Sequence, residues 1–251
     1  MALSRRQKLT IISLLLYWPI IFILAHIPVP QLVREAHVSD KSLHFLAYLV
    51  LVFLLWFAIR PDRTVNWRKA AIWWVLLVIA GYGVVDELLQ SFVVGRSCDV
   101  MDFFANLIGV LTGLILFTFL TFWPALLVVT GIVIFVSANL TQANLADLLP
   151  VANVMLMFHL FAYGFFTMLW IQHIHHFLSL KAPKPQWLMV ALALPTGFLL
   201  AVKLFSVISG KNFAAPDVII SAVGIATVVG ITYLAALFRR RTTGKLPPRD
   251  S

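Results

Sequence analysis

The stretch that decides the fold runs from Gly81 to Gly113 and reads GYGVVDELLQSFVVGRSCDVMDFFANLIGVLTG. Apolar runs flank a Gly95-Arg96 pair, so the stretch predicts the end of one membrane helix, a short turn and the start of a second helix. Six strongly polar side chains fall within about six helical turns: Asp86, Glu87, Gln90, Arg96, Asp102 and Asn106. Because such groups are costly in or beside a membrane span, we expect them to be kept for function.

The composition of the whole chain also indicates a membrane protein. Of the 251 residues, 61% are hydrophobic and 12% are charged, which is too apolar for an ordinary soluble domain or a disordered chain. The net charge of +9 is compatible with a nucleic-acid partner. The basic residues cluster at helix ends, however, which indicates that they orient the helices in the membrane. A single cysteine, Cys98, excludes a disulfide within the chain, and we expect no cofactor.

About eight transmembrane helices are predicted from apolar runs of the roughly 20 residues that a bilayer requires. Their predicted ranges are 8–26, 41–59, 70–92, 100–120, 123–138, 152–174, 186–207 and 215–238. The first run is long and is followed by no small-residue cleavage pattern, so an uncleaved helix is predicted rather than a signal peptide. The predicted fold class is therefore an all-α polytopic membrane protein.

The basic residues predict the orientation of these helices. Most Lys and Arg lie on one predicted side, in the N-terminal segment, in loops 60–69 and 181–184, and in the tail 239–251. The positive-inside rule therefore places both termini in the cytoplasm and the polar stretch at the extracytoplasmic side. The tail is expected to contact anionic lipid head groups rather than nucleic acid.

An internal repeat divides the chain. His44-Phe-Leu-Ala-Tyr48 returns 115 residues later as His159-Leu-Phe-Ala-Tyr163. The same offset pairs Ser91 with Ser206, Gly95-Arg96 with Gly210-Lys211, Asp102 with Asp217, Asn106 with Ser221 and Gly109 with Gly224. This register predicts two tandem four-helix repeats in parallel orientation, 1–121 and 122–238, followed by the tail 239–251. The second repeat is degenerate, because Ala201, Val202 and Phe205 stand where the first has Asp86, Glu87 and Gln90.

The first half of the chain resembles the VanZ-like family of bacterial membrane proteins across roughly residues 38 to 116. The residues that carry the resemblance are Asp40-Lys41-x-x-His44-Phe-x-x-Tyr48, Asp86-Glu87-x-x-Gln90-x-Phe92-x-x-x-Arg96 and Asp102-x-x-x-Asn106-x-x-Gly109-x-x-x-Gly113. The second half matches this pattern only in part. The resemblance implies a multi-pass protein of the bacterial cytoplasmic (inner) membrane, in a family sometimes linked to resistance to teicoplanin-type glycopeptides.

Helical spacing predicts how the polar residues assemble. Gly109 and Gly113 form a small-xxx-small surface that should face another helix and carry Asp102 and Asn106 into the interior. We therefore expect a polar cleft in the outer leaflet. Its candidate catalytic residues are His44, Glu87, Arg96 and Asp102, and its candidate binding residues are Asp40, Lys41, His44, Tyr48, Asp86, Glu87, Gln90, Arg96, Asp102 and Asn106. No metal site is predicted, because His173, His175 and His176 have too few ligating partners on their side.

Several functions fit this pattern. The cleft is expected to bind or act on a cell-envelope or lipid-linked ligand, with His44 and Glu87 as an acid–base pair if there is a reaction. The alternatives are a transporter or flippase built from parallel repeats, an accessory protein that binds a partner, and a purely structural network in which Arg96 neutralises Glu87 or Asp102. Membrane lipids are the expected partners, and the oligomeric state is left open.

Overall fold

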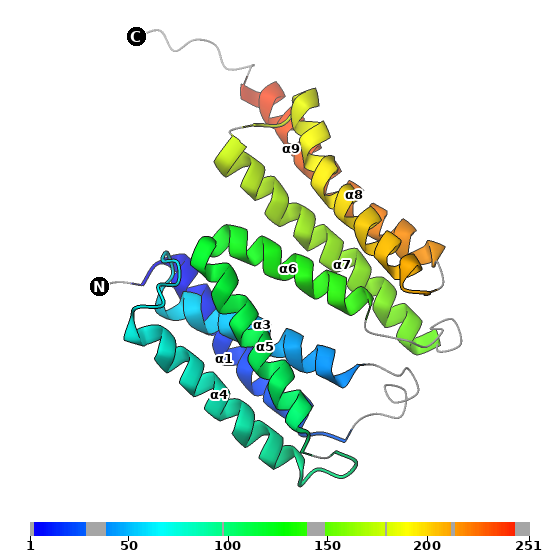
Figure 1. Ribbon diagram of the computed structural model, residues 1–251. Coiled ribbons are helices and arrows are strands. Elements are labelled where there is room, and N and C mark those ends of the chain that lie inside the picture. Colours follow the sequence, from blue (N-terminus) through cyan, green and yellow to red (C-terminus); the bar gives the residue numbers. More distant parts are fainter. Residues whose placement is uncertain are drawn as a thin grey trace. The chain divides into compact units, whose positions relative to one another are not determined.

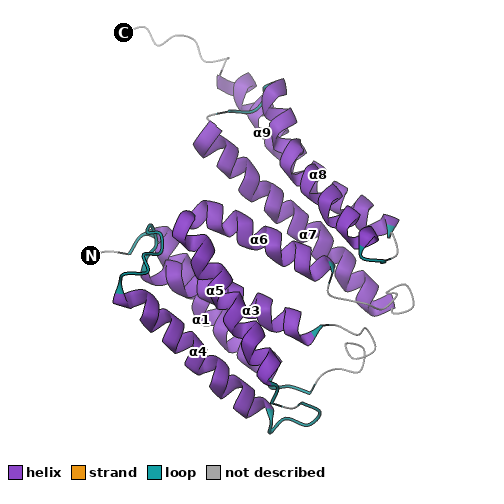
Figure 2. Cartoon of the chain, viewed as in Figure 1, coloured by secondary structure: helices purple, strands orange, loops and turns teal. Residues whose placement is uncertain are grey.

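The structure is a computed structural model and describes residues 3–28, 39–96, 98–139, 149–178, 180–211 and 214–243 (Figure 1). Within these residues the regular secondary structure is entirely helical (Figure 2). The helices are α1 (Arg5–Ala25), α3 (Asp40–Ile59), α4 (Ala70–Gln90), α5 (Val100–Phe119), α6 (Phe122–Ala138), α7 (Leu149–His173), the π-helical η2 (Ile174–Leu178), α8 (Pro185–Ile208) and α9 (Ala215–Thr243). The all-α prediction is confirmed, and each predicted range overlaps one of the long helices.

Most of these helices are built to cross a membrane. Seven spans in the described residues are long and apolar enough, and α6 is shorter at 17 residues. Large apolar side chains point outward along them, including Leu15, Trp74 and Leu200, which are each more than 60% exposed. A soluble protein would bury such side chains, whereas lipid solvates them. The chain is therefore a multi-pass membrane protein.

The helices form two compact units, Met1–Ala143 (unit 1) and Asn144–Ser251 (unit 2). In unit 1, α3 is the central helix and packs on α1, α4, α5 and α6. Its aromatic side chains Phe53 and Phe57 contact Phe117 of α5 and Phe122 of α6. Since α6 packs in unit 1, the unit boundary lies beyond residue 121, where the first repeat is predicted to end; the division into repeats stays a prediction.

The closest helix contact in unit 1 joins α3 to α5. A Cβ atom at Gly109 would overlap the backbone carbonyl of Phe45, and one at Gly113 would lie 2.5 Å from Cγ1 of Val52. The small-xxx-small surface of α5 therefore faces α3, as predicted. It also turns Asp102 and Asn106, which lie on the same stripe, into the interior, where they are 5% and 1% exposed.

In unit 2, α7 packs on α8 and α9. A Cβ atom at Gly224 would lie 2.5 Å from the carbonyl oxygen of Leu160, so α9 approaches α7 as closely as α5 approaches α3. Gly95 and Gly210 both have a positive φ, 81° and 79°, a conformation that glycine adopts without strain. These pairs follow the 115-residue register, and the duplication stays a prediction.

Candidate functional site: a buried polar cluster in unit 1

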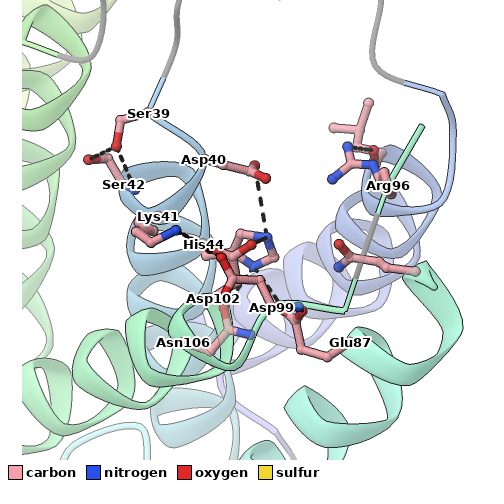
Figure 3. A network of polar contacts seen from close by, with 12 residues as sticks. Ser39, Asp40, Lys41, Ser42, His44, Glu87, Arg96, Asp99, Asp102 and Asn106 are labelled. Atoms are coloured by element: carbon pink, nitrogen blue, oxygen red, sulfur yellow. Dashed lines mark hydrogen bonds and ion pairs between the residues drawn. The ribbon is translucent and has the colours of Figure 1, made fainter.

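Four buried polar side chains gather where α3 and α5 begin and α4 ends: His44, Glu87, Asp102 and Asn106, called the polar cluster below (Figure 3). Each is at most 7% exposed. Local capping fixes these helix ends, because Ser39 accepts a hydrogen bond from the backbone of Ser42 and Asp99 accepts one from the backbone of Met101. The predicted assembly of these four residues is thus seen in the structure.

His44 is the centre of the polar cluster. Its Nδ1–H donates to Oδ1 of Asn106 over 3.0 Å, and Nδ1 lies 3.7 Å from Oε1 of Glu87. Its Nε2 lies 3.9 Å from both Oδ2 of Asp102 and Oδ1 of Asp40, and Asp40 is about half exposed. Both ring nitrogens therefore face carboxylates.

Lys41 is the fixed cation at the edge of the polar cluster. Its Nζ donates to Oδ2 of Asp99 over 3.0 Å and lies 3.5 Å from Oδ1 of Asp102. The hydrogen bonds from the Met101 backbone and from Lys41 lower the pKa of the Asp99 carboxyl, so this group is ionised at neutral pH. Asp99 was absent from the predicted site residues, although an Asp directly before an apolar helix is an N-cap signal that could have identified it.

Asp86 and Gln90 extend the polar cluster along α4. Nε2 of Gln90 donates to Oδ2 of Asp86 over 3.0 Å, and both side chains are 2% exposed. Asp86 and Glu87 are adjacent and point about 100° apart, yet both are buried because α4 has neighbours on two sides. Glu87 faces His44 of α3, whereas Oδ1 of Asp86 lies 3.8 Å from Nδ1 of His26, the C-cap of α1. The sequence prediction missed His26.

Arg96 does not take the expected place. Its guanidinium donates to the backbone carbonyls of Leu24 and Ile27, each over 3.3 Å, at the end of α1. Within the described residues it forms no ion pair with Glu87 or Asp102, so the expected neutralisation of these carboxylates by Arg96 is not part of this structure. Figure 3 shows Arg96 apart from His44. The reason is that residues 91–96 form a loop that turns back toward α1.

Tyr48 lies one helical turn from His44 and is 2% exposed, as expected for a residue on the same face. Its ring stacks on Tyr82 with centroids 5.9 Å apart, and its hydroxyl lies against Gly83. The hydroxyl has no hydrogen-bond partner among the described residues. Tyr48 thus forms the inner, more apolar wall behind His44.

Several buried atoms of this site have no hydrogen-bond partner within the described part of the chain. They include Oδ1 of Asp86, Oε1 of Glu87 and Nδ2 of Asn106. Leaving one buried polar atom unsatisfied costs about 1–3 kcal/mol, and more for a charged group. Native proteins leave few such atoms, and several close together are typical of a site that takes up a partner.

Unit 2 has a simpler counterpart at the same register. Nε2 of His159 lies 3.7 Å from Oδ2 of Asp217, and Nζ of Lys203 donates to that oxygen over 2.8 Å. Val202, which matches Glu87, is 1% exposed. A buried apolar side chain thus replaces Glu87, whereas Ala201, which matches Asp86, is exposed, and the remaining Asp has its own cation.

The histidines near the end of α7 are occupied by local contacts. Nε2 of His175 accepts a hydrogen bond from Nε1 of Trp187 over 3.0 Å, and His173 stacks between Trp170 and Phe177. In the described residues, each group of three side chains that could hold a metal ion contains His44.

Comparison with known proteins bears directly on unit 1. The family model described as VanZ/LLP1 matches residues 7–122. No curated protein and no solved structure matches the chain. The matched region contains the whole polar cluster together with Lys41, Asp86, Gln90 and Arg96. The resemblance seen in the first half of the sequence is therefore confirmed: residues 7–122 of this membrane protein are similar to the VanZ/LLP1 family.

Proposed function

We propose that unit 1 binds the polar head group of a cell-envelope or lipid-linked ligand at the polar cluster. The observation that carries this proposal is the pair of buried carboxylate oxygens without partners, Oε1 of Glu87 and Oδ1 of Asp86. An ionised carboxylate at this burial requires a compensating partner. The cations nearby are already committed, since Lys41 pairs with Asp99 and Asp102 while Arg96 binds backbone carbonyls.

The surroundings support an amphipathic ligand. Carboxylate oxygens only accept hydrogen bonds, so they favour a head group that carries hydroxyl or amine donors. Next to them, Leu88, Phe92 and Val94 are exposed apolar side chains at and beyond the end of α4, and the latter two are each 84% exposed. A lipid-linked molecule presents both parts, a polar head group for the carboxylates and an apolar chain for this surface. The cleft predicted from the sequence is part of this proposal.

The proposal places this end of unit 1 at the extracytoplasmic face of the bacterial cytoplasmic membrane, with both termini in the cytoplasm. The asymmetry of Lys and Arg supports this orientation. Fusing a reporter that is active only in the cytoplasm to the C-terminus should give an active fusion. An active C-terminal fusion of a reporter that works only outside the cytoplasm would contradict the orientation.

Acid–base chemistry on the bound ligand is the second candidate function. It is favoured by the position of His44, with Glu87 at one ring nitrogen and Asp102 at the other. Such a pair transfers protons when its groups reach a reacting atom. The test uses the purified His44→Gln variant. If this variant still binds the ligand but no longer turns it over, the result supports an enzymatic function. Equal loss of binding would support binding alone.

The test compares one residue in each unit. Glu87→Gln should abolish the phenotype that the protein confers, scored first as sensitivity to a teicoplanin-type glycopeptide, with normal amounts of protein in the membrane. Asp217→Asn should have a mild effect, because the cation and imidazole around Asp217 form a balanced structural group. Mass spectrometry of lipids that co-purify with each variant gives a second readout. A silent Glu87→Gln beside an inactive Asp217→Asn would overturn the proposal.

A further inference from the structure

Three side chains of unit 1 have the chemistry of a metal-ligand set. His44 of α3 and the adjacent Asp86 and Glu87 of α4 each offer one ligand atom, and these atoms all lie within 4.8 Å of one another. The three side chains are 7%, 2% and 3% exposed.

The free lone pairs of this group point to a ligand. Oδ1 of Asp86 and Oε1 of Glu87 have no hydrogen-bond partner within the described residues. The other oxygen of each carboxylate is held in place, that of Asp86 by Gln90 over 3.0 Å and that of Glu87 by the backbone N–H of Asp99 over 3.4 Å. One oxygen of each carboxylate is therefore held by a hydrogen bond, as protein groups behind a metal ligand orient it. Asp86 also interacts with the Tyr82 hydroxyl, and its Oδ1 lies 3.8 Å from Nδ1 of His26.

Two ionised carboxylates at this place would be stabilised by a cation. Asp86 and Glu87 would carry two negative charges in a buried site, where unpaired charge is strongly unfavourable. The cationic side chain nearest to the polar cluster, Lys41, is 3.0 Å from Asp99 and 3.5 Å from Asp102. Its ion pairs lie with those two carboxylates, so the pair on α4 is left for another cation.

We propose that His44, Asp86 and Glu87 bind a divalent transition-metal ion of the Zn²⁺ or Mn²⁺ type. Imidazole favours Zn²⁺ and its neighbours, and carboxylates also suit Mn²⁺, whereas Mg²⁺ and Ca²⁺ prefer oxygen ligands throughout. Metal–ligand distances of about 2.1 Å place ligand atoms about 3.4 Å apart in a tetrahedral site, close to the 3.7 Å between Nδ1 of His44 and Oε1 of Glu87. Three protein ligands leave a position for water or for an oxygen of a bound molecule.

The surroundings of His44 fit this role. When Nδ1 binds the ion, the ring proton moves to Nε2, which lies 3.9 Å from a carboxylate oxygen of Asp102 and of Asp40. At 3.9 Å these carboxylates attract a proton on Nε2 electrostatically but do not accept a hydrogen bond from it. Asn106, which accepts from Nδ1 without the ion, is then free to accept from metal-bound water.

A second group, Asp40, His44 and Asp102, shares the histidine and so competes with the first. It is the weaker choice, because Asp40 is exposed and Lys41 already lies 3.5 Å from Asp102. Substituting Asp102 therefore separates the two groups: binding that survives Asp102→Asn belongs to Asp86 and Glu87.

The experiment measures metal binding on the purified full-length protein in detergent, carrying an affinity tag without histidine. After chelator treatment and dialysis, Zn²⁺, Mn²⁺ and Mg²⁺ are titrated separately by calorimetry, and bound metal is counted by elemental analysis. We expect one Zn²⁺ or Mn²⁺ per chain, with affinity roughly tenfold or more weaker in Glu87→Gln and in Asp86→Asn. The measurement of metal binding requires no activity. Its result therefore does not depend on whether the envelope ligand proposed above is bound.

Matched variants identify the site. A protein with His173, His175 and His176 all changed to Ala, and the variant Asp217→Asn, should both keep the ion, since neither touches His44. Thermal unfolding checks folding: at the same Zn²⁺ concentration, the melting temperature should rise more for the wild type than for Glu87→Gln. The proposal is overturned by absence of stoichiometric binding, by binding of Mg²⁺ alone, by binding that survives both α4 variants, or by loss of the ion in the triple histidine variant.

Discussion

The two units place a His and an Asp on neighbouring helices in the same way and differ in what surrounds them. In unit 2, Asp217 has a cation of its own in Lys203, 2.8 Å away. In unit 1, Asp102 has Lys41, and two further buried carboxylates, Asp86 and Glu87, have no fixed cation within the described residues. Since Val202 fills the place of Glu87 in unit 2, packing alone does not require a carboxylate there.

This difference distinguishes the residues that hold the helices together from the residues that we assign to function. We propose that the sequence repeats 1–121 and 122–238 descend from one four-helix ancestor, supported by the matching glycine contacts of Gly109 and Gly224 and the matching turns at Gly95 and Gly210. The shared residues hold helices together. The unshared acidic pair adds unfavourable buried charge, which a functional site tolerates and a structural one does not.

The glycine contacts should be equally essential in both units. Gly109→Leu and Gly224→Leu each force a side chain into a facing backbone carbonyl, that of Phe45 or Leu160. The cost should exceed the about 1–3 kcal/mol of ordinary overpacking, and it should appear as a large fall in melting temperature in detergent. Gly81→Ala is the control, because a Cβ there meets nothing within 4 Å and should leave stability unchanged or slightly raised. Tolerance of Leu at only one of the two positions would break the equivalence of the units.

The acidic residues should affect stability with opposite signs in the two units. Glu87→Gln removes a buried charge without a cation while keeping an oxygen for the Asp99 backbone, so it should stabilise the protein by about 1 kcal/mol or more. Asp217→Asn leaves Lys203, which is 12% exposed, without its carboxylate and should destabilise by about 1–3 kcal/mol. Thermal unfolding with a chelator present, so that no divalent ion contributes, measures both. The same sign for both variants would contradict the contrast between a balanced and an unbalanced site.

Substitution of Asp99 should have the smallest effect on stability. The effect should be specific to unit 1, because unit 2 has Ala214 at the equivalent position. Its pKa is lowered by the Met101 backbone N–H and by Lys41, so the ionised carboxylate stabilises the fold above its unfolded pKa of about 4. That contribution is lost as the pH falls through the lowered value. Asp99→Asn should therefore lower the melting temperature slightly at pH 7, by an amount that shrinks toward pH 3. A difference independent of pH would assign the effect to helix capping alone.

The residues that the sequence could group correctly are those governed by helical periodicity. His44 with Tyr48, and Asp102 with Asn106, Gly109 and Gly113, share faces because residues three or four apart are neighbours on a helix. Their burial follows from the glycines, which draw α5 onto α3. Arg96 and His26 could not be placed in this way, because each lies beyond a helix end, where no period fixes the direction of the side chain.

The membrane class, the helices, the VanZ-like pattern and the concentration of polar groups in the first half follow from the sequence, because composition and periodicity act locally along the chain. The pairing of the charges could be seen only in the folded bundle. Lys41 of α3 pairs with Asp99 and Asp102 at the start of α5. Arg96 donates to backbone carbonyls at the end of α1. Asp86 and Glu87 remain without a fixed cation in the described residues. The physical reason is that an ion pair requires contact within about 4 Å, and which helix ends come that close depends on how the bundle packs.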